Sequence, residues 1–546
     1  MAPSPASVST TTAVEMEEIA SSSSSASPPS SIIWKCGSTV FDRSVGIYGH
    51  EDPANRMSIA DLLGCEAKGS WLHIAGYPKN RSTRSGCCMP SSNGRRSRVS
   101  FSVKCSSSSE AESHALSFRR ELAAVRNTSL ERKMLVSINP QSGPGKALKT
   151  WRSSCKQLFL DACINLDERV TERKDHALDI VRDMDAEELL SYECIVVVSG
   201  DGLVFEILQG IMQRKDWSKI MRSVQFGVVH GGSGNGLANS VCDASDCRLT
   251  PRDAAFVVVT GEAKPMDIAA VDVGTSAESA KRYYSFLSLS WAFMGDVDIE
   301  SESLRWMGDA RFVVQSVKRI LKLRKYKGRL SFLPADNAGM TSSMLGPRIA
   351  EDAKNVESYW ERVERLEREK KEEEKRDADN NDDNDDDEEE EKRDADDEEG
   401  EKDSPPAIDS PPELHLLPAI GEPVPDNWQV IEDTFLHMWN CNCSYMASDA
   451  IAAPSARVSD GFHQLTFLRK HGPKGASRGK MLSYLLGLDK GNVENSKSVE
   501  MCVTQAYRLE PLSGEKTGHI VLDGELVDYT AIQLQVLKGL GRIKSL

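Results

Sequence analysis

The chain has 546 residues, of which 39% are hydrophobic, and a formal net charge of −16. This length is enough for two to four domains, but the hydrophobic content is low for a chain that folds along its whole length. Residues 361–402 hold 24 acidic and 10 basic side chains, a net of −14, and the nearly neutral remainder gives no reason to expect nucleic-acid binding.

The N-terminal part of the chain changes character near residue 32. Residues 1–31 are rich in Ser, Pro and Ala, which predicts a disordered tail. Between residues 32 and 125, short apolar patches alternate with Gly, Asn and Ser, a pattern typical of strands and turns. The stretch "SSEAESHALSFRRELAAV" then has the spacing of one amphipathic helix. We therefore predict a small β module that is closed by a helix.

Residues 130–263 show the clearest alternation of strands and helices. The apolar runs "KMLVSIN", "CIVVVS" and "VQFGVVH" predict buried strands, and helical stretches lie between them, with "HALDIVRDMDAEELL" as one helix. This alternation predicts parallel strands in a doubly wound α/β domain. Ligands bind at the carboxyl ends of the strands in such sheets. We therefore expect Asn139-Pro140, Ser199 to Gly202 and His230 to Gly234 to lie along one edge.

Residues 264–546 are rich in short strands and contain one helical stretch, at about residues 311–324. The pattern predicts an antiparallel β-sandwich as the C-terminal domain. A charged insert, residues 355–426, interrupts this domain. Its first part, "SYWERVERLEREKKEEEKR", is compatible with a solvated helix. The remainder is too acidic and too rich in Pro to bury a core, so we predict that it is disordered.

The sequence contains no signal for export or for a membrane span. No apolar run approaches the ~20 residues that a spanning helix needs, and no basic start precedes a hydrophobic core at the N-terminus. The thirteen cysteines include no CxxC pair, which indicates reduced thiols rather than a zinc site. We therefore expect a cytoplasmic protein.

Three glycine-bearing turns follow the predicted strands: "NPQSGPGKA", "SGDG" and "GGSGNG". None has the GxxxxGK[ST] spacing of a Walker A loop. Glycine lets backbone N–H groups approach phosphate oxygens, and helix N-termini add a favourable dipole. One such turn alone would be read as structural. Three on one sheet edge predict a site for a nucleotide or polyphosphate.

Asp201 lies at the tip of the second turn, and two interpretations are open. It is either the cap of a tight strand-to-helix turn or a base that accepts the proton of an attacking hydroxyl during phosphoryl transfer. The second interpretation needs cations, which Arg305 and Arg311 could supply. Asp298 and Glu302, spaced i,i+4, could receive an amine on one helical face. A plain solvated helix is the alternative for that segment.

Together the motifs SGDGL, GSGN, DVDIESE and a late DGE resemble those of the sphingosine kinases, which are diacylglycerol-kinase-like lipid kinases. The resemblance covers about residues 132–327 and 428–546, and the preceding segment resembles the PH-like region of some members. SGDGL is the sphingosine-kinase form, whereas ceramide, diacylglycerol and NAD kinases have GGDG. The resemblance implies ATP-dependent phosphorylation of the primary hydroxyl of sphingosine and related sphingoid bases. It also implies Mg²⁺ as cofactor and peripheral contact with a membrane surface.

The family pattern assigns roles to individual residues. Asp201 would be the general base, and no ligands are assigned to Mg²⁺. The nucleotide would be surrounded by Asn139, Gln141, Thr171, Glu172, Arg173, Lys174, Asp175, Glu206, Gly232, Ser233, Gly234, Arg305, Arg311, Asp523, Gly524 and Glu525. The lipid would be bound by Ser199, Gly200, Gly202, Leu287, Ser288, Trp291, Phe293, Met294 and Asp298, the last of these at the polar head.

The sequence departs from the family pattern at two positions, and two alternative functions remain open. Gln141 stands where the family commonly has arginine, and His230 where it usually has proline, and either could change the affinity for ATP. One alternative is a ceramide or diacylglycerol kinase, which would not need a carboxylate at Asp298. The other is a lipid-binding scaffold with a dead kinase core that works through the N-terminal module and the acidic insert, with unknown protein partners.

Overall fold

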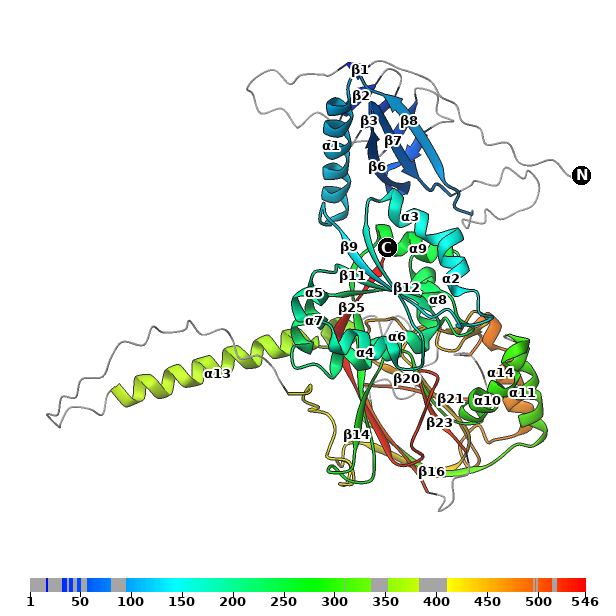
Figure 1. The fold of residues 1–546 in the computed structure, drawn as a ribbon. Coiled ribbons are helices and arrows are strands. Elements are labelled where there is room, and N and C mark those ends of the chain that lie inside the picture. Colours follow the sequence, from blue (N-terminus) through cyan, green and yellow to red (C-terminus); the bar gives the residue numbers. More distant parts are fainter. Residues whose placement is uncertain are drawn as a thin grey trace, which may run out of the picture.

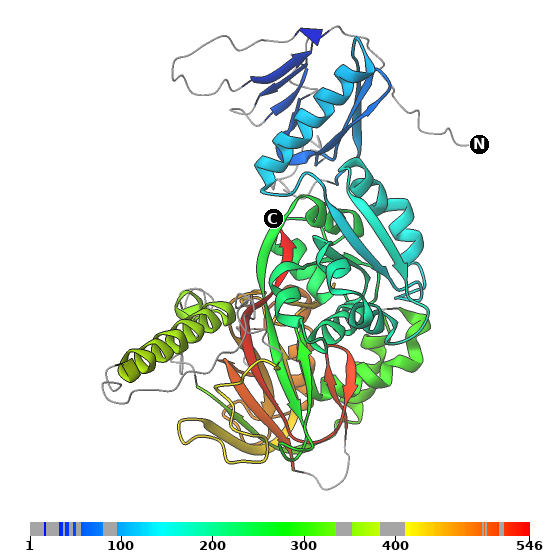
Figure 2. The same ribbon diagram turned by 60° about the vertical axis from the view of Figure 1, so that its left-hand side comes forward.

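A four-stranded parallel sheet lies at the centre of the molecule, between an N-terminal module and a β-rich C-terminal region (Figures 1 and 2). The computed structural model describes residues 16–17, 32–36, 39–42, 47–50, 56–79, 95–308, 310–334, 352–382, 410–493, 496, 499–512 and 518–546. Most of the predicted tail and of the predicted acidic tract lies outside these residues. Within the described part of the chain, no helix is both long enough and apolar enough to span a bilayer.

The N-terminal module contains two antiparallel sheets and one helix. The first sheet joins β1 (Met16–Glu17), β2 (Ile32–Cys36), β3 (Thr39–Asp42), β4 (Ile47–His50) and β5 (Arg56–Ser58). The second joins β6 (Leu62–Lys68), β7 (Trp71–Gly76) and β8 (Val99–Lys104). Helix α1 (Ser108–Arg126) packs Phe118 and Leu122 against Leu62 and Leu72 of the second sheet. The resemblance of this module to a PH-like region stays a prediction.

The central sheet has the strand order β10-β9-β11-β12, and all of its pairs are parallel. Its strands are β9 (Lys133–Ile138), β10 (Asn165–Val170), β11 (Cys194–Ser199) and β12 (Gln225–His230). Alternate residues of β11 enter two different cores, since Ile195 and Val197 pack in one cluster and Val196 and Val198 in another. Both faces of the sheet are therefore covered, which explains why β11 is apolar throughout.

The helices of this domain differ in places from the sequence pattern. They are α2 (Ala147–Thr150), the π-helical turn η3 (Trp151–Cys155), α3 (Lys156–Asp161), α4 (His176–Asp183), α5 (Ala186–Leu190), α6 (Asp201–Met212), α7 (Trp217–Ser223), α8 (Gly236–Ala244) and α9 (Pro251–Thr260). The prediction of one helix over 176–190 is wrong. The helix stops at Met184, because the Asp185 side chain accepts from Glu187 N and Glu188 N and starts a new helix.

The C-terminal region is rich in strands. Its elements are β13 (Glu262–Val273), β14 (Lys281–Ser285), β15 (Ser288–Ala292), α10 (Phe293–Ser301), η4 (Glu302–Met307), α11 (Ala310–Leu321), β16 (Tyr326–Phe332), α13 (Tyr359–Asp382), β17 (Gln429–Cys441), β18 (Tyr445–Ala447), β19 (Ala450–Ile451), β20 (His463–Arg469), α14 (Arg478–Leu485), η5 (Leu488–Lys490), β21 (Glu500–Thr504), β22 (Ala506–Pro511), β23 (Ile520–Leu522), β24 (Glu525–Val527) and β25 (Ile532–Ser545). The prediction of an α/β domain followed by a β-rich region is confirmed.

Strand β25 joins the two parts of the molecule. It pairs in parallel with β12 of the central sheet and antiparallel with β13 and β22, so hydrogen bonding connects fifteen strands in one continuous sheet. Lys544 on this strand is almost completely buried, and its Nζ lies 2.6 Å from Glu193 Oε1 of the α/β domain. The two domains are therefore tied by the last strand of the chain. A face-to-face sandwich in the C-terminal region stays a prediction.

The start of the charged insert is helical and anchored. Helix α13 projects away from the body of the molecule (Figure 1), but its first turn packs on the α/β domain. The Trp360 ring stacks on Trp217 with 6.2 Å between centroids, and the Arg222 guanidinium lies 4.3 Å from the centre of the Trp360 ring. The insert therefore leaves the molecule in a defined direction.

Candidate functional site

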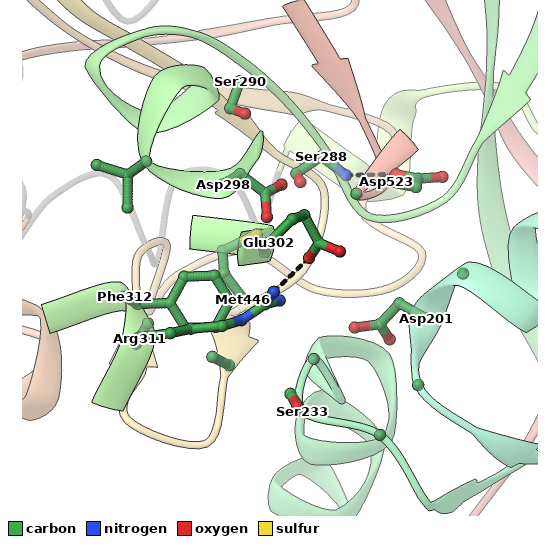
Figure 3. A pocket seen from close by; sticks show the side chains of 18 of the residues that line it. Asp201, Ser233, Ser288, Ser290, Asp298, Glu302, Arg311, Phe312, Met446 and Asp523 are labelled. Carbon is green, nitrogen blue, oxygen red and sulfur yellow. Dashed lines mark hydrogen bonds and ion pairs between the residues drawn. The ribbon is translucent and has the colours of Figure 1, made fainter. Parts of the chain in front are cut away.

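A cavity of about 970 Å³ lies between the carboxyl ends of the parallel strands and the β-rich region. The turns after β9, β11 and β12 line one side, and α10, α11, α14 and the β23–β24 turn line the other. Figure 3 shows the carboxyl groups of Asp201, Asp298 and Glu302 facing this space from different elements.

The three glycine turns pack directly on one another. A Cβ atom added at Gly200 would lie 2.5 Å from the carbonyl oxygen of Gly234, and one added at Gly232 would lie 2.5 Å from Gly200 Cα. Only glycine allows the backbones to approach so closely. Ser142 links the first turn to the second, because its Oγ accepts from Ser199 Oγ at 3.0 Å and from Gly200 N at 3.1 Å. These turns present backbone amides beside the starts of α6 and α8, an arrangement suited to phosphate oxygens.

Asp201 is the first residue of α6, and its side chain reaches the start of α8. Gly236 N donates to Asp201 Oδ2 at 2.8 Å, and Leu237 N donates to Oδ1 at 3.2 Å. Burial raises the pKa of Asp201 to about 6, although the two amide donors favour its ionised form. Each carboxylate oxygen keeps a second lone pair, so it can still accept a proton. A buried carboxylate with a pKa close to neutrality has the properties of a general base.

An ion pair crosses the cavity between the two domains. Lys174, in the loop before α4, lies 2.7 Å from Glu525 Oε2 in the β23–β24 turn. Both side chains are partly exposed, so the pair contributes little stability and can rearrange when a ligand enters. On the α/β side, Glu206 accepts from Ala177 N at 3.2 Å, and burial raises its pKa.

Asp523 has a different environment from Asp201. Its carboxylate accepts hydrogen bonds from Ser285 Oγ at 2.8 Å and from the amides of Phe286, Leu287 and Ser288 at 2.8 to 3.1 Å. Burial raises its pKa to about 7 against these four donors. The carboxylate therefore holds the β14–β15 turn, which places Leu287 and Ser288 at the cavity.

The side of the cavity opposite Asp201 carries two acids and one arginine. Asp298 and Glu302 line it from successive turns, and Arg311 forms an ion pair with Glu302 (Figure 3). The Arg311 guanidinium lies 4.4 Å from the centre of the Phe312 ring. The side chain of Arg305 lies outside the described residues.

The outer part of the cavity is apolar. Helix α11 and the segment around α14 supply most of its wall, namely Phe312, Val313, Val317, Ile320, Leu482, Leu485, Leu486 and Leu488. Trp439 on β17 and Met446 on β18 complete it. The cavity therefore has a polar end at the glycine turns and an apolar end between two helices.

Most of the residues singled out from the sequence line this one cavity. Those that do so are Asn139, Gln141, Thr171, Glu172, Arg173, Lys174, Ser199, Gly200, Asp201, Gly202, Glu206, Gly232, Ser233, Gly234, Leu287, Ser288, Met294, Asp298, Arg311, Asp523, Gly524 and Glu525. Asp175, Trp291 and Phe293 do not line this cavity. Asp175 caps α4 with a left-handed backbone, and Trp291 and Phe293 are fully buried in the main core. His230 is also buried, with its Nε2 2.7 Å from Asn239 Oδ1.

The sequence analysis missed several residues that shape the site. Ser142 and Asn235 hold the glycine turns, and the Asn235 Oδ1 accepts from Gly231 N and Gly232 N. Asn235 could have been found as the polar member of the GSGN motif. The residues of α14 could not, because only the tertiary fold brings this helix to α11.

The sequence is similar to those of known lipid kinases. Residues 133–271 match the family described as the diacylglycerol kinase catalytic domain. The chain is 31% identical over 413 residues to sphingosine kinase 1 of Mus musculus, covering 74% of this chain and 88% of the mouse protein. It is 28% identical over 479 residues to sphingosine kinase 1 of Arabidopsis thaliana, covering 84% of each. A solved diacylglycerol kinase from Bacillus anthracis str. Sterne aligns with a TM-score of 0.44 and 13% identity over 76% of this chain and 97% of that one. By its identity to the mouse protein over most of that protein's length, the chain belongs to the sphingosine kinase family.

Proposed function

We propose that the protein is an ATP-dependent kinase that phosphorylates the primary hydroxyl of sphingosine and related sphingoid bases. The observation that carries this proposal is the position of Asp201. Its carboxylate lies where the glycine turns meet the cavity that continues between α11 and α14. A nucleotide and a long-chain alcohol could both reach this point.

In the proposed reaction the lipid hydroxyl attacks the γ-phosphorus of ATP and its proton passes to Asp201. The bond between the γ-phosphorus and the bridging oxygen breaks, and ADP leaves. The amides of the glycine turns and the guanidinium of Arg311 would stabilise the negative charge on the phosphoryl oxygens. The pKa of Asp201, at about 6, lets the carboxylate be ionised at neutral pH and still accept a proton.

The carboxylates at the polar end fit a magnesium ion. Mg²⁺ binds one or two carboxylates together with substrate phosphates. Glu525 lies beside the Asp201 turn, since a Cβ added at Gly202 would lie 3.6 Å from Glu525 Oε1. Glu525 would therefore hold the ion together with the phosphates of ATP. When bound, it would neutralise charge on the transferred phosphoryl group.

The other end of the cavity suits the lipid. Its apolar wall would bury the alkyl chain, at about 0.8 kcal/mol per CH₂ before other costs. Asp298 and Glu302 place two carboxylates near the polar head, of which Glu302 is paired with Arg311. A cationic amine would be attracted there, whereas the amide of ceramide or the ester groups of diacylglycerol would not. The acidic lining therefore favours a sphingoid base.

We also propose that the enzyme takes its lipid from a membrane surface. Leu321 and Leu486 are 68% and 69% exposed and lie on the two segments that form the apolar wall, and Trp306, which is 82% exposed, lies on η4 just before α11. Large apolar side chains gathered at the mouth of a pocket are typical of a membrane contact. This arrangement would let an alkyl chain pass from the bilayer into the cavity without crossing water.

The test is a substrate panel with the purified full chain, Mg²⁺ and radiolabelled ATP. Sphingosine, dihydrosphingosine and phytosphingosine should be phosphorylated, and ceramide and diacylglycerol should not. Asp201→Asn should lower turnover by roughly 10³-fold or more, as expected on loss of a general base, while Asp183→Asn, in an exposed acid of the same domain, should not. Preferential phosphorylation of ceramide would overturn the substrate class, and ATP binding without transfer would favour a scaffold.

A further inference from the structure

Helix α11 presents different side chains to the cavity and to its neighbour α10. Phe312, Val313, Val317 and Ile320 line the cavity. Arg311, Gln315 and Arg319, spaced i, i+4 and i+8, form a second row, which we call the polar row. All three contact acids of the segment 296–302. Helix α11 thus forms a wall of the apolar end of the cavity, which we call the lipid end. The polar row attaches the helix to the acids of the segment 296–302.

Arg319 makes the densest contacts of this row. Its Nε lies 2.5 Å from Glu300 Oε2, its Nη2 pairs with Glu300 Oε1, and its Nη1 lies 3.9 Å from Asp296 Oδ2. Gln315 Nε2 donates to Glu300 Oε2 at 2.6 Å. Because the fork of a guanidinium matches a carboxylate in two places, this contact fixes orientation as well as distance.

The acids that receive Arg319 are themselves fixed. The Asp296 side chain is completely buried, and its Oδ2 accepts from Tyr326 OH at 2.5 Å and from Arg324 Nη1 at 2.8 Å. His519 Nδ1 lies 3.2 Å from Asp296 Oδ1. These groups come from β16, the loop before it and the segment before β23. The polar row is therefore attached to the β-rich core and not to a loose surface.

Asp296, Glu300 and His519 could also be read as ligands of a metal ion, since their donor atoms all lie within 4.8 Å of one another. The guanidinium groups of Arg319 and Arg324 already contact both carboxylates and balance their charge. A divalent cation would have to displace two arginines. The arrangement is therefore better explained as an ion-pair junction.

Apolar packing contributes little to holding α11 against the rest of the molecule. Among its side chains only Arg311 and Gln315 are buried, while Val313, Val317 and Leu321 are more than half exposed. Phe312 and Ile320 are only half-buried against the main core. A helix that faces a cavity with its apolar side must be held by other contacts, and the polar row supplies them.

We propose that Arg319 is a positioning residue that holds α11 as the wall of the lipid end. This inference rests on the proposed function, because it assigns that wall to the alkyl chain. Loss of Arg319 would let α11 move away from the cavity, so the chain would lose contacts. The glycine turns that would bind the nucleotide belong to other elements, and Arg311, two turns away from Arg319 on α11, would keep its own ion pair with Glu302. The effect should therefore fall on the lipid and not on ATP.

The experiment compares Arg319→Met with the wild-type full chain. KM for sphingosine should rise by roughly tenfold with kcat changed much less, and KM for ATP should stay within about twofold. A short-chain analogue that does not reach the wall should show a smaller effect. Arg319→Lys, which keeps the charge but loses the two-point contact, should recover only part of the loss. Gln315→Leu removes one contact and should show the same pattern more weakly.

The matched control is Arg469→Met. Arg469 is also a partly buried arginine that contacts two acids, with three hydrogen bonds to Glu500 and its Nη1 3.6 Å from Asp433 Oδ2, but it lies on β20. The substitution Arg469→Met should leave the KM values for sphingosine and for ATP unchanged. Equal rises in both KM values for Arg319→Met, or a fall in kcat alone, would overturn the proposal.

Hydrogen–deuterium exchange without substrates separates this inference from the proposed function. Arg319→Met should speed exchange of the amides of residues 310–321 and leave β20 unchanged, because α11 would open locally. If Arg319→Met speeds exchange in α11 but the wild type phosphorylates no sphingoid base, the proposed function is contradicted and the positioning role of Arg319 is supported. If the wild type is active and α11 exchanges as before, the positioning role fails. Protection of α10 by Mg²⁺ alone would show a metal site and overturn the ion-pair reading.

Discussion

At the scale of single residues, Asp201 and Asp523 show how environment separates two buried acids. Both have raised pKa values because burial disfavours the charged form. Asp201 accepts two hydrogen bonds, one on each carboxylate oxygen, whereas Asp523 accepts four, three of them on Oδ1. The first therefore suits proton transfer and the second suits the fixing of a turn.

The pKa of Asp201 predicts a pH dependence. A base must be ionised to accept a proton, so kcat/KM for the lipid should rise with pH through about pH 6 and then level off. At pH 5 it should be roughly tenfold below its value at pH 7.5, since one pH unit below the pKa leaves about a tenth of the base ionised. Initial rates over this range check the prediction, and tryptophan fluorescence at each pH controls for unfolding. A flat profile would contradict the role of Asp201.

The contacts of Asp523 predict a loss of stability. Asp523→Ala leaves the hydroxyl of Ser285 and three backbone amides without an acceptor, which should lower the free energy of unfolding by roughly 3 to 5 kcal/mol. Urea unfolding measures this value. Asp528→Ala, in an exposed acid of the next turn, serves as control and should cost less than about 1 kcal/mol. A small effect at Asp523 would favour direct binding of the nucleotide instead.

At the scale of elements, α11 and α14 form the apolar end of the cavity and an exposed apolar surface. Leu321 belongs to that surface but does not line the cavity, so it can be changed without altering the lipid site. Leu321→Glu should weaken binding to lipid vesicles by roughly tenfold, through loss of buried apolar area and added charge. Vesicle flotation measures the change.

Val125→Glu gives the control for the vesicle experiment. Val125 is also an exposed apolar residue of a helix, but it lies in α1 of the N-terminal module. It should leave vesicle binding unchanged. Turnover of a water-soluble short-chain substrate should be normal in both variants. If Leu321→Glu and Val125→Glu weakened vesicle binding equally, the proposed membrane contact at α11 and α14 would be contradicted.

Sequence reasoning predicts the inner elements of this fold better than the outer ones. The strands β9, β11 and β12 are apolar and end in glycine turns, so their common edge follows from pattern alone. β10 was not predicted as a strand, because it is an edge strand whose residues are exposed or half-buried. Phe293 and Met294 are adjacent, yet one packs in the core and the other lines the cavity. Such choices depend on which tertiary neighbours surround the helix.

At the scale of the whole molecule, the two domains share one sheet. Lys544 Nζ contacts Glu193 and donates to the carbonyl of Gly261, and it is almost completely buried. Lys544→Met should lower the free energy of unfolding by roughly 1.5 to 3 kcal/mol, because Glu193 loses one charged partner but keeps two hydrogen bonds from Arg132. Both domains should unfold in one transition, and chemical denaturation followed by fluorescence checks this.

Arg542→Met provides the comparison for Lys544. It lies on the same strand, is exposed and makes one bond, to the carbonyl of Arg222. Its loss should cost less than about 1 kcal/mol. Two separate transitions in the wild type would contradict the coupling of the domains.

The position of β25 also has a consequence for how the protein is made. β12 is synthesised well before β25, so the nascent chain has an unpaired strand edge at β12 until β25 emerges from the ribosome. Exposed edges of this kind invite pairing with other chains. A chain truncated before β25 would keep this edge exposed, which would favour its aggregation.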